Sequence, residues 1–356
     1  MIKVLELFAG IGACSKALEN LGIEHEIVDA VEIDKYAIAA FNAIHGTNFE
    51  PQDITKWDKD IECDLIMHGS PCQDFSIAGK QAGGDEGSGT QSSLMYETLR
   101  IVDKLRPKYV IWENVKNLLS KKHVHNWNAY AEYMEELGYV NYCQVLNAKD
   151  YGIPQNRERV FTVSIRVPGP IPEAIKKMLF RFPPRRPLAR RLKDMLEDEV
   201  GESCYLNNDQ TKGLVFDIPN VSYCIDANYW KGTTPKQYLT KHRRQLVAIK
   251  TANTKGYDLA IDGDGIDLGY PDSKTRRGRV GHGVAKTLPT SDSQGVLDGL
   301  RIRKLTPKEC YRLMGFDDAS FERAAKVISN TQLYKTAGNS IVVPVLEAIL
   351  KELLCK

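Results

Sequence analysis

MIKVLELFAGIGACSKALEN, residues 1–20, is the stretch of sequence that decides the fold. It predicts an apolar strand at Lys3–Leu7 and a helix at Ala13–Asn20, joined by a turn that contains Gly10 and Gly12. Glycines at such a turn let the backbone approach a ligand and direct the free N–H groups of the helix toward it. A dinucleotide fingerprint would place a third glycine near Ser15, and its absence disfavours a nicotinamide cofactor.

Beyond this stretch, short apolar runs alternate with amphipathic segments through the first half of the chain. The apolar runs predict strands at Glu26–Val31, Asp64–His68, Lys108–Trp112, Tyr142–Leu146 and Val160–Ile165. Helices are predicted at Lys35–His45, Met95–Leu105 and His125–Leu137. This alternation is typical of an α/β fold with a doubly wound parallel sheet.

The second half of the chain lacks this alternation of apolar and amphipathic segments. Six prolines between Pro168 and Pro187 interrupt the alternation and indicate the exit from the first domain. Residues 188–300 show only weak periodicity, so no fold is predicted for them. Helical patterns return at Thr306–Met314, with Thr306 as N-cap, and at Val342–Leu354.

Composition excludes several classes of protein. The chain has 356 residues, of which 42% are hydrophobic and 26% charged, so it can bury a core and is not a disordered chain. No apolar run approaches the roughly 18 residues of a membrane span, and the N-terminus lacks a signal-peptide pattern. The eight cysteines form no CxxC pair, which argues against a metal site and for a reducing compartment. We therefore expect a cytoplasmic protein without a metal.

Charge is divided unevenly along the chain. Residues 1–150 contain 14 Lys and Arg against 23 Asp and Glu, whereas residues 151–356 contain 34 against 23. A basic half favours a polyanionic partner, nucleic acid first. Two solvated surfaces of different charge would explain the numbers equally well.

Two carboxylates follow the glycine turn at positions that suit a nucleoside. Glu32 ends the second predicted strand and is placed to accept hydrogen bonds from two ribose hydroxyls. Asp53 could accept from an adenine amino group, while Ile54 and Phe8 enclose the ring. Each carboxylate alone would be read as a surface group, but together with the turn they favour a nucleoside site.

The segment after the strand Asp64–His68 contains the strongest candidate nucleophile. Cys72 follows Pro71 at the carboxyl end of a predicted strand, where doubly wound sheets place their sites. The next residues, 73–90, include five glycines and almost no apolar side chains. They predict a mobile loop that closes over a substrate.

Three further polar groups stand at strand or helix ends. Glu113 and Asn114 follow the strand Lys108–Trp112, and burial there is expected to raise the pKa of the Glu113 carboxyl. Arg157 and Arg159 are expected to project from the same face of one strand. Ser340, after Asn339, is expected to cap the final helix.

Five blocks of sequence occur in a fixed order. They are FAGIG at 8–12, GSPCQ at 69–73, ENV at 113–115, QNRER at 155–159 and AGNS at 337–340. In order and spacing they resemble those of the DNA (cytosine-5) methyltransferases of bacterial or phage type. RKLTPKECYRLMGF, residues 303–316, resembles a further family block. The likeness covers about residues 1–166 and 300–356, and Ser70 stands where many members have Phe or Pro.

The resemblance implies a fold and a domain organisation. The fold is a doubly wound mixed sheet, that of the S-adenosylmethionine-dependent methyltransferases, with a smaller target-recognition domain. We expect a catalytic and cofactor-binding domain at 1–187, a target-recognition domain at 188–306, a hinge at 307–338, and a C-terminal helix at 339–356 that returns to the catalytic domain.

The resemblance also implies roles for individual residues. For catalysis it implies Cys72 as nucleophile, Glu113 at the cytosine N3 and N4 edge, Arg159 beside the base with Arg157 supporting it, and Asn114 and Pro71 around them. S-adenosylmethionine would be bound by Phe8, Gly10, Ile11, Gly12, Glu32, Ile33, Asp53, Ile54, Asn339 and Ser340. Expected DNA contacts are Gln73, Ser76 and Lys80 in the loop, and Arg276, Arg277, Arg279 and Thr287 in the recognition domain.

The implied activity is methyl transfer to C5 of a flipped-out cytosine in a specific double-stranded DNA sequence, through a Cys72–C6 bond. A monomer is expected, either paired with a separate restriction endonuclease or as a phage or orphan modification enzyme. Two rivals remain: the same chemistry on tRNA, whose family carries a Cys-Phe-Thr block not found here, and an inactive DNA-binding regulator built on this fold.

Overall fold

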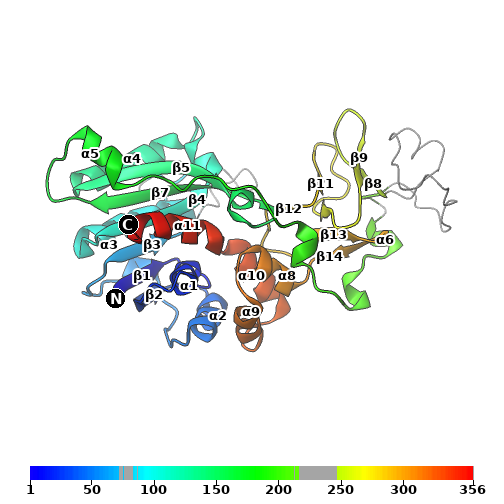
Figure 1. The fold of residues 1–356 in the computed structure, drawn as a ribbon, viewed down its shortest axis with the longest axis horizontal. Coiled ribbons are helices and arrows are strands. Elements are labelled where there is room, and N and C mark those ends of the chain that lie inside the picture. Colours follow the sequence, from blue (N-terminus) through cyan, green and yellow to red (C-terminus); the bar gives the residue numbers. More distant parts are fainter. Residues whose placement is uncertain (72–74, 76–82, 86, 212, 216–246, 356) are drawn as a thin grey trace.

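The computed structural model describes residues 1–71, 75, 83–85, 87–211, 213–215 and 247–355. Figure 1 shows a larger domain built around a six-stranded sheet and, beside it, a smaller domain of short strands. The polypeptide passes from the larger domain to the smaller one and returns, so that both chain ends lie in the larger domain.

The large sheet is mixed. Strands β2 (His25–Val31), β1 (Ile2–Leu7), β3 (Leu65–His68) and β4 (Tyr109–Val115) run parallel in that order. Next come β7 (Glu158–Arg166), antiparallel to β4, and β5 (Tyr139–Asn147), antiparallel to β7. The predicted doubly wound sheet is thus confirmed, in its mixed form.

Helices cover both faces of this sheet. Helices α1 (Ala13–Asn20) and α11 (Val343–Leu354) pack against each other on one face, and α3 (Met95–Leu105) and α4 (Val124–Glu136) cover the other. Both faces need cover because the side chains of β1 alternate between them. Val4 packs into the core beneath α1 and α11, whereas Leu5 and Leu7 pack into the core beneath α3 and α4. Helix α2 (Lys35–His45) follows β2, with Asp34 as N-cap and Gly46 at its end.

The smaller domain is assembled from short antiparallel strands. One four-stranded sheet has the order β11 (Val280–Gly281), β10 (Gly265–Asp267), β13 (Gln294–Asp298) and β14 (Arg301–Lys304). Beside it lies the hairpin β8 (Val247–Lys250) and β9 (Tyr257–Ala260). Their small core includes Ile249, Ile266 and Leu297. Strands this short carry little periodicity, which is why the sequence predicted none of them.

A hydrogen-bonded strand pair connects the two domains. Strand β12 (Ala285–Lys286) runs parallel to β6 (Gln155–Asn156), which immediately precedes β7 of the large sheet. Between β6 and β12 in the sequence, the chain also forms the helices α5 (Glu173–Leu179) and α6 (Asn208–Thr211).

Three helices return the chain to the larger domain. They are α8 (Pro307–Leu313), α9 (Asp318–Ala325) and α10 (Asn330–Asn339). The predicted start of α8 is confirmed, since Thr306 and Glu309 form a reciprocal capping box and Pro307 is the first helical residue. Helix α9 packs against α2.

Three local predictions were wrong. Glu113 and Asn114 lie inside β4 rather than after it, because pairing with β7 extends the strand to Val115. Arg157 lies in the break between β6 and β7, so it does not share one strand with Arg159. Ser340 does not cap α11, whose N-cap is Val342 without a side-chain hydrogen bond; Ser340 follows the end of α10 instead.

Candidate active site

The glycine turn at the end of β1 has the backbone conformation that only glycine adopts easily. Gly10 and Gly12 have φ of 55° and 76°. A methyl group on Gly12 would also lie 2.1 Å from Nε2 of His45, whose ring contacts the Ile11 carbonyl at 3.1 Å. Both the dihedral angle and the space therefore require Gly12.

Glu32 fixes this turn in place. Its Oε2 accepts a hydrogen bond from the Gly10 N–H at 3.0 Å, and its Oε1 accepts from the Asp34 N–H at 2.9 Å. Burial raises the pKa of Glu32, and these backbone N–H donors oppose the rise. Each oxygen keeps a further lone pair for a ligand hydroxyl. Ile33, beside it, is 70% exposed.

Asp53 is held next to Glu32 by the backbone, because the Gln52 N–H donates to the Glu32 carbonyl at 2.8 Å. Oδ1 of Asp53 accepts from both the N–H and the hydroxyl of Thr55, and these hydrogen bonds lower the pKa of the Asp53 carboxyl. Ile54 is buried. The structure thus places Asp53 near Glu32, next to the glycine turn.

A cavity connects the glycine turn with Glu113. Its lining includes residues from β1, from the turn, from the end of β3 and from the segment after α10: Glu6, Phe8, Gly10, Cys14, Gly69, Glu113, Asn339 and Ser340. Two acidic side chains in this lining suit a ligand that carries positive charge. Of the predicted cofactor residues, Phe8, Gly10, Asn339 and Ser340 line this cavity together with Glu113.

Glu113 and Arg159 form a buried ion pair at the sheet edge. Arg159 Nε lies 3.0 Å from Glu113 Oε1, and both side chains are less than one-fifth exposed. The pKa of Glu113 is raised by burial, and the positive charges of Arg159 and Arg157 work against that rise. This carboxyl can therefore be protonated or ionised according to what binds beside it.

The loop after β3 is held by side chains of β4. Trp112 Nε1 donates to Ser70 Oγ at 2.9 Å, and Asn114 Nδ2 donates to the Ser70 carbonyl at 3.2 Å. Asn114 is buried and acts on this loop rather than facing the cavity lining. Pro71 ends the described part of the loop. Among the predicted site residues, Cys72, Gln73, Ser76 and Lys80 lie outside the described residues.

Arg157 connects three segments. Its guanidinium donates to the carbonyls of Leu288 at 3.3 Å, Gly338 at 3.0 Å and Ser340 at 2.9 Å. It is 4% exposed. Arg157 thus supports the segment that closes the cavity, while Arg159 forms the ion pair with Glu113 described above.

The predicted DNA contacts of the smaller domain separate into two groups. Arg277 and Thr287 are exposed, and the Thr287 hydroxyl donates to the Asn156 carbonyl at 2.9 Å. Arg276 is partly exposed and pairs with Asp267. Arg279 does not belong with them: it is 1% exposed, and its guanidinium is surrounded by backbone carbonyls of its own loop. The expectation that Arg279 contacts DNA directly was therefore wrong.

Two functional side chains were missed at the sequence level. Glu6 is 3% exposed, accepts from the Ser15 N–H at 3.0 Å and has its pKa raised by burial to about 7. Its signal was a single acid within the apolar run VLELF. Gln155 links the domains, since its Nε2 donates to the Leu313 carbonyl and its Oε1 accepts from the Leu288 N–H. No sequence signal distinguished it from other residues of its block.

The described residues contain no group of three or more His, Cys, Asp or Glu side chains that could hold a metal ion. None of the helices within this part of the chain has the length and apolar character needed to cross a membrane.

Comparison with known proteins decides the family. The family model described as C-5 cytosine-specific DNA methylase matches residues 2–355. The chain belongs to this family. The methylase is 36% identical to "Type II methyltransferase M2.ScrFI" of Lactococcus lactis subsp. cremoris, with 99% of each chain covered. It is 33% identical to "Orphan methyltransferase M.SPRI" of Bacillus phage SPR, covering 99% of this chain and 97% of the other.

"Type II methyltransferase M.HhaI" of Haemophilus parahaemolyticus is 32% identical, covering 98% of the methylase and 93% of the relative. Among solved structures, one described as a putative DNA modification methyltransferase encoded within an Escherichia coli prophage has a TM-score of 0.61 at 19% identity, over 99% of the methylase and 98% of that chain. S. pombe Dnmt2 methyltransferase has a TM-score of 0.59, also at 19% identity, with 99% and 98% covered. At these identities the two structures show the fold alone.

Proposed function

We propose that this methylase transfers a methyl group from S-adenosylmethionine to C5 of a cytosine that is flipped out of a specific double-stranded DNA sequence. The observation that carries the proposal is the position of Glu113. Its buried carboxyl pairs with Arg159 and lines the same cavity as the glycine turn. The loop that leads to Cys72 is anchored next to it, since Gly69 lines that cavity too.

The chemistry requires a nucleophile and an acid on opposite sides of one base. C5 of cytosine reacts poorly with a methyl donor, and addition of a thiolate to C6 makes C5 nucleophilic. We assign the thiolate to Cys72 and the proton delivered to N3 to Glu113, whose raised pKa suits that task. After methyl transfer a base removes the C5 proton, the Cys72–C6 bond breaks, and the aromatic ring is restored.

The described residues fit the cofactor. Gly10, Gly12 and Glu32 would hold its nucleoside, with Asp53, Ile54, Phe8 and Ile33 around the adenine and Asn339 and Ser340 closing the cavity. When bound, S-adenosylmethionine supplies an electrophilic methyl group on a positively charged sulfur. The Glu6 carboxyl lines the same cavity and would balance part of that charge in its ionised form.

The base cannot react inside a stacked duplex, and flipping it out costs a few kcal/mol. Phosphate contacts from the basic half would offset this cost. We assign target recognition to residues 188–306 and the catalytic centre to 1–187 with 339–356. We further propose that the methylase acts as a monomer in the cytoplasm of a bacterium or phage-infected cell, either alone or with a separate restriction endonuclease.

A trapping experiment tests the Cys72 assignment. With 5-fluorocytosine at the target position, C5 carries fluorine, which no base can remove as a proton, so the reaction stops with the enzyme still attached. We expect a protein–DNA adduct that survives denaturing electrophoresis, forms only with S-adenosylmethionine, and maps to Cys72. Cys72→Ser should give no adduct and still bind DNA, because a hydroxyl is far less ionised than a thiol. An adduct on another of the eight cysteines would exclude this mechanism.

A second assay separates the rivals. Bisulfite sequencing of DNA from a methylation-free host that expresses the gene should reveal methylated cytosines in one sequence context. Tritium transfer from the cofactor should then occur to DNA of that sequence and not to tRNA. Transfer to tRNA alone would favour the RNA rival, and DNA binding without transfer would favour the regulator.

A further inference from the structure

Tyr270 has an unusual combination of properties. Its side chain is 76% exposed, the largest exposed fraction among the large hydrophobic side chains of the described residues. Its backbone is in the left-handed region, with φ of 51°. An aromatic residue rarely adopts this conformation, and strain of this kind concentrates at ligand-binding segments. Solvent exposure and backbone strain are both unfavourable, so the fold must hold this ring in place from elsewhere.

The buried guanidinium of Arg279 provides that support. It donates to the carbonyls of Asp267 at 3.1 Å, Gly269 at 2.9 Å and Pro271 at 3.3 Å, and also to the carbonyl of Tyr270 itself. Four acceptors around one side chain fix the course of the loop on both sides of Tyr270. A conformation held this firmly loses little entropy when the loop meets a partner.

A second brace comes from Asp267. Its carboxylate accepts from the Gly269 N–H at 3.0 Å and from Arg276 Nε at 2.6 Å. The Arg276 guanidinium lies 5.3 Å from the centre of the Tyr270 ring. This cation over the ring restricts the ring's orientation and places positive charge beside an exposed apolar surface.

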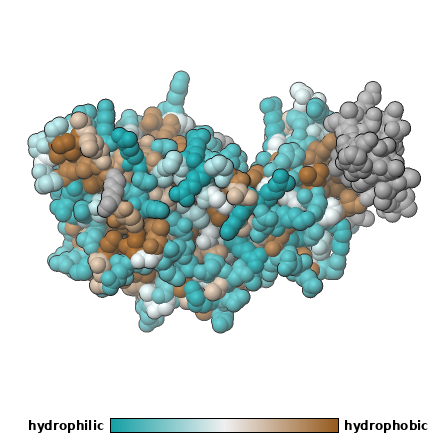
Figure 2. All heavy atoms as spheres, in the orientation of Figure 1, coloured by the Kyte–Doolittle hydropathy of each residue, from teal (hydrophilic) through white to brown (hydrophobic). Residues whose placement is uncertain are grey.

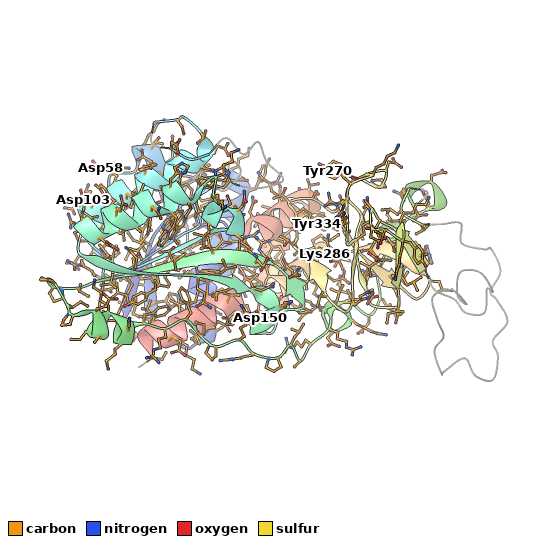
Figure 3. The ribbon with its side chains drawn as sticks, turned by 90° about the horizontal axis from the view of Figure 1, so that it is seen from above. Asp58, Asp103, Asp150, Tyr270, Lys286 and Tyr334 are labelled. Atoms are coloured by element: carbon orange, nitrogen blue, oxygen red, sulfur yellow. The ribbon has the colours of Figure 1, made fainter. Side chains whose placement is uncertain are left out.

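The loop lies at the junction of the two domains. The loop begins at the end of β10, which packs against β12, and Gly278 in the loop lies near the end of the Lys286 side chain. β12 pairs with β6, and β6 is followed directly by the segment that holds Arg159. Figure 3 places Tyr270 on the side of the smaller domain that is nearer the larger domain.

We propose that Tyr270 contacts a base edge of the bound duplex and so helps to determine which DNA sequence is methylated. The inference rests on the proposed function and deepens it. Arg277 and Lys274 are exposed in the same loop and would hold phosphates, which position the duplex without reading its sequence. The rigid ring would supply the contact that discriminates between base pairs.

Three variants separate the ring from the backbone. Tyr270→Asn removes the ring and keeps a residue that tolerates the left-handed conformation, Tyr270→Gly removes both ring and strain, and Tyr270→Phe keeps the ring. Tyr133→Ala, at an exposed tyrosine of α4, is the matched control. The substrates are duplexes that carry the methylated sequence found by bisulfite sequencing, together with every single base-pair substitution of it.

We expect Tyr270→Asn and Tyr270→Gly to reduce discrimination in single-turnover methylation at least tenfold at one position of the sequence. Tyr270→Phe and Tyr133→Ala should retain wild-type ratios. Wild-type affinity for S-adenosylmethionine, measured by calorimetry, would show that the variants are folded. Wild-type ratios in both ring-less variants would overturn the proposal. An equal loss on all duplexes, or a loss in Tyr270→Asn that Tyr270→Gly restores, would also overturn it. Failure of the wild type on every duplex would instead contradict the proposed function.

Discussion

At Glu113, burial and two arginines act in opposite directions on one carboxyl. Burial favours the protonated form, whereas Arg159 and Arg157 favour the anion. We predict that Glu113→Gln lowers the single-turnover methylation rate by about 10²-fold or more, as expected for loss of a general acid. The amide keeps the size of the side chain but cannot deliver a proton to N3. Rapid-quench measurement checks this, with DNA affinity by polarisation as the control; a near-normal rate would show that another group is the acid.

Glu6 leads to a prediction about pH. Its pKa is raised from 4.5 to about 7 by burial, so the folded state binds this proton more tightly than the unfolded state. The unfolding free energy is therefore unaffected below pH 4.5 and decreases as pH rises through about 7, by about 3 kcal/mol in total. Glu6→Gln should remove this contribution. Urea unfolding at several pH values should show the variant gaining stability relative to the wild type as pH rises. A constant difference across that range would contradict the assignment.

At the scale of elements, the turn between β1 and α1 gives a test with an internal control. Gly12→Ala should destabilise the fold and abolish cofactor binding, because the new methyl group meets both a left-handed φ and the ring of His45. Gly22→Ala meets a similar φ of 66° with nothing within 4 Å. Thermal unfolding of both variants should show the cost of strain alone at Gly22, about 1–2 kcal/mol, and a larger cost at Gly12. Equal effects would mean that the His45 contact is unimportant.

Elements were predictable where a local pattern encodes them. Gly10 and Gly12, the N-cap Asp34 and the capping box at Thr306 are all short-range signals, and the structure confirms the elements they start or end. The extent of β4 was not predictable, because Glu113 and Asn114 end the apolar run while pairing with β7 continues the strand. Strands of two or three residues such as β11 and β12 are likewise defined by their partners.

Site residues divide in the same way. Glu32 directly follows β2, whereas Glu113 lies inside β4 and Asp53 caps the short turn that begins at Ile54, so only the position of Glu32 after a strand was predictable from the local pattern. The sequence predicted Arg279 to be an exposed cation, because no local pattern indicates that the preceding loop folds around its side chain. The sequence predicted that Arg157 and Arg159 project from one face of the same strand. Because the strand is interrupted before β7, the Arg157 side chain instead hydrogen-bonds to the carbonyls of Gly338 and Ser340.

On the scale of the whole molecule, a buried ion pair joins the smaller domain to the returning helices. Arg303 of β14 and Glu309 of α8 are both almost completely buried, with Nη2 and Oε1 2.9 Å apart. Glu309→Gln should cost about 3 kcal/mol of unfolding free energy, because Arg303 loses its buried partner and keeps only the partly exposed Asp298. Glu202→Gln breaks the exposed pair with Arg301 and should change stability little. Chemical denaturation of both variants checks this; similar effects would indicate that burial does not control the strength of the pair.

The parallel pair between β12 and β6 has a consequence for how such enzymes can diversify. A module joined by flexible linkers could be exchanged at any point within them, whereas the proposed recognition domain is joined in register through Ala285 with Gln155 and Lys286 with Asn156. A graft from another methylase would have to preserve that register and the Arg303–Glu309 pair at once. New specificities are therefore expected to arise more readily by altering loops between these two joints than by exchanging the module as a block.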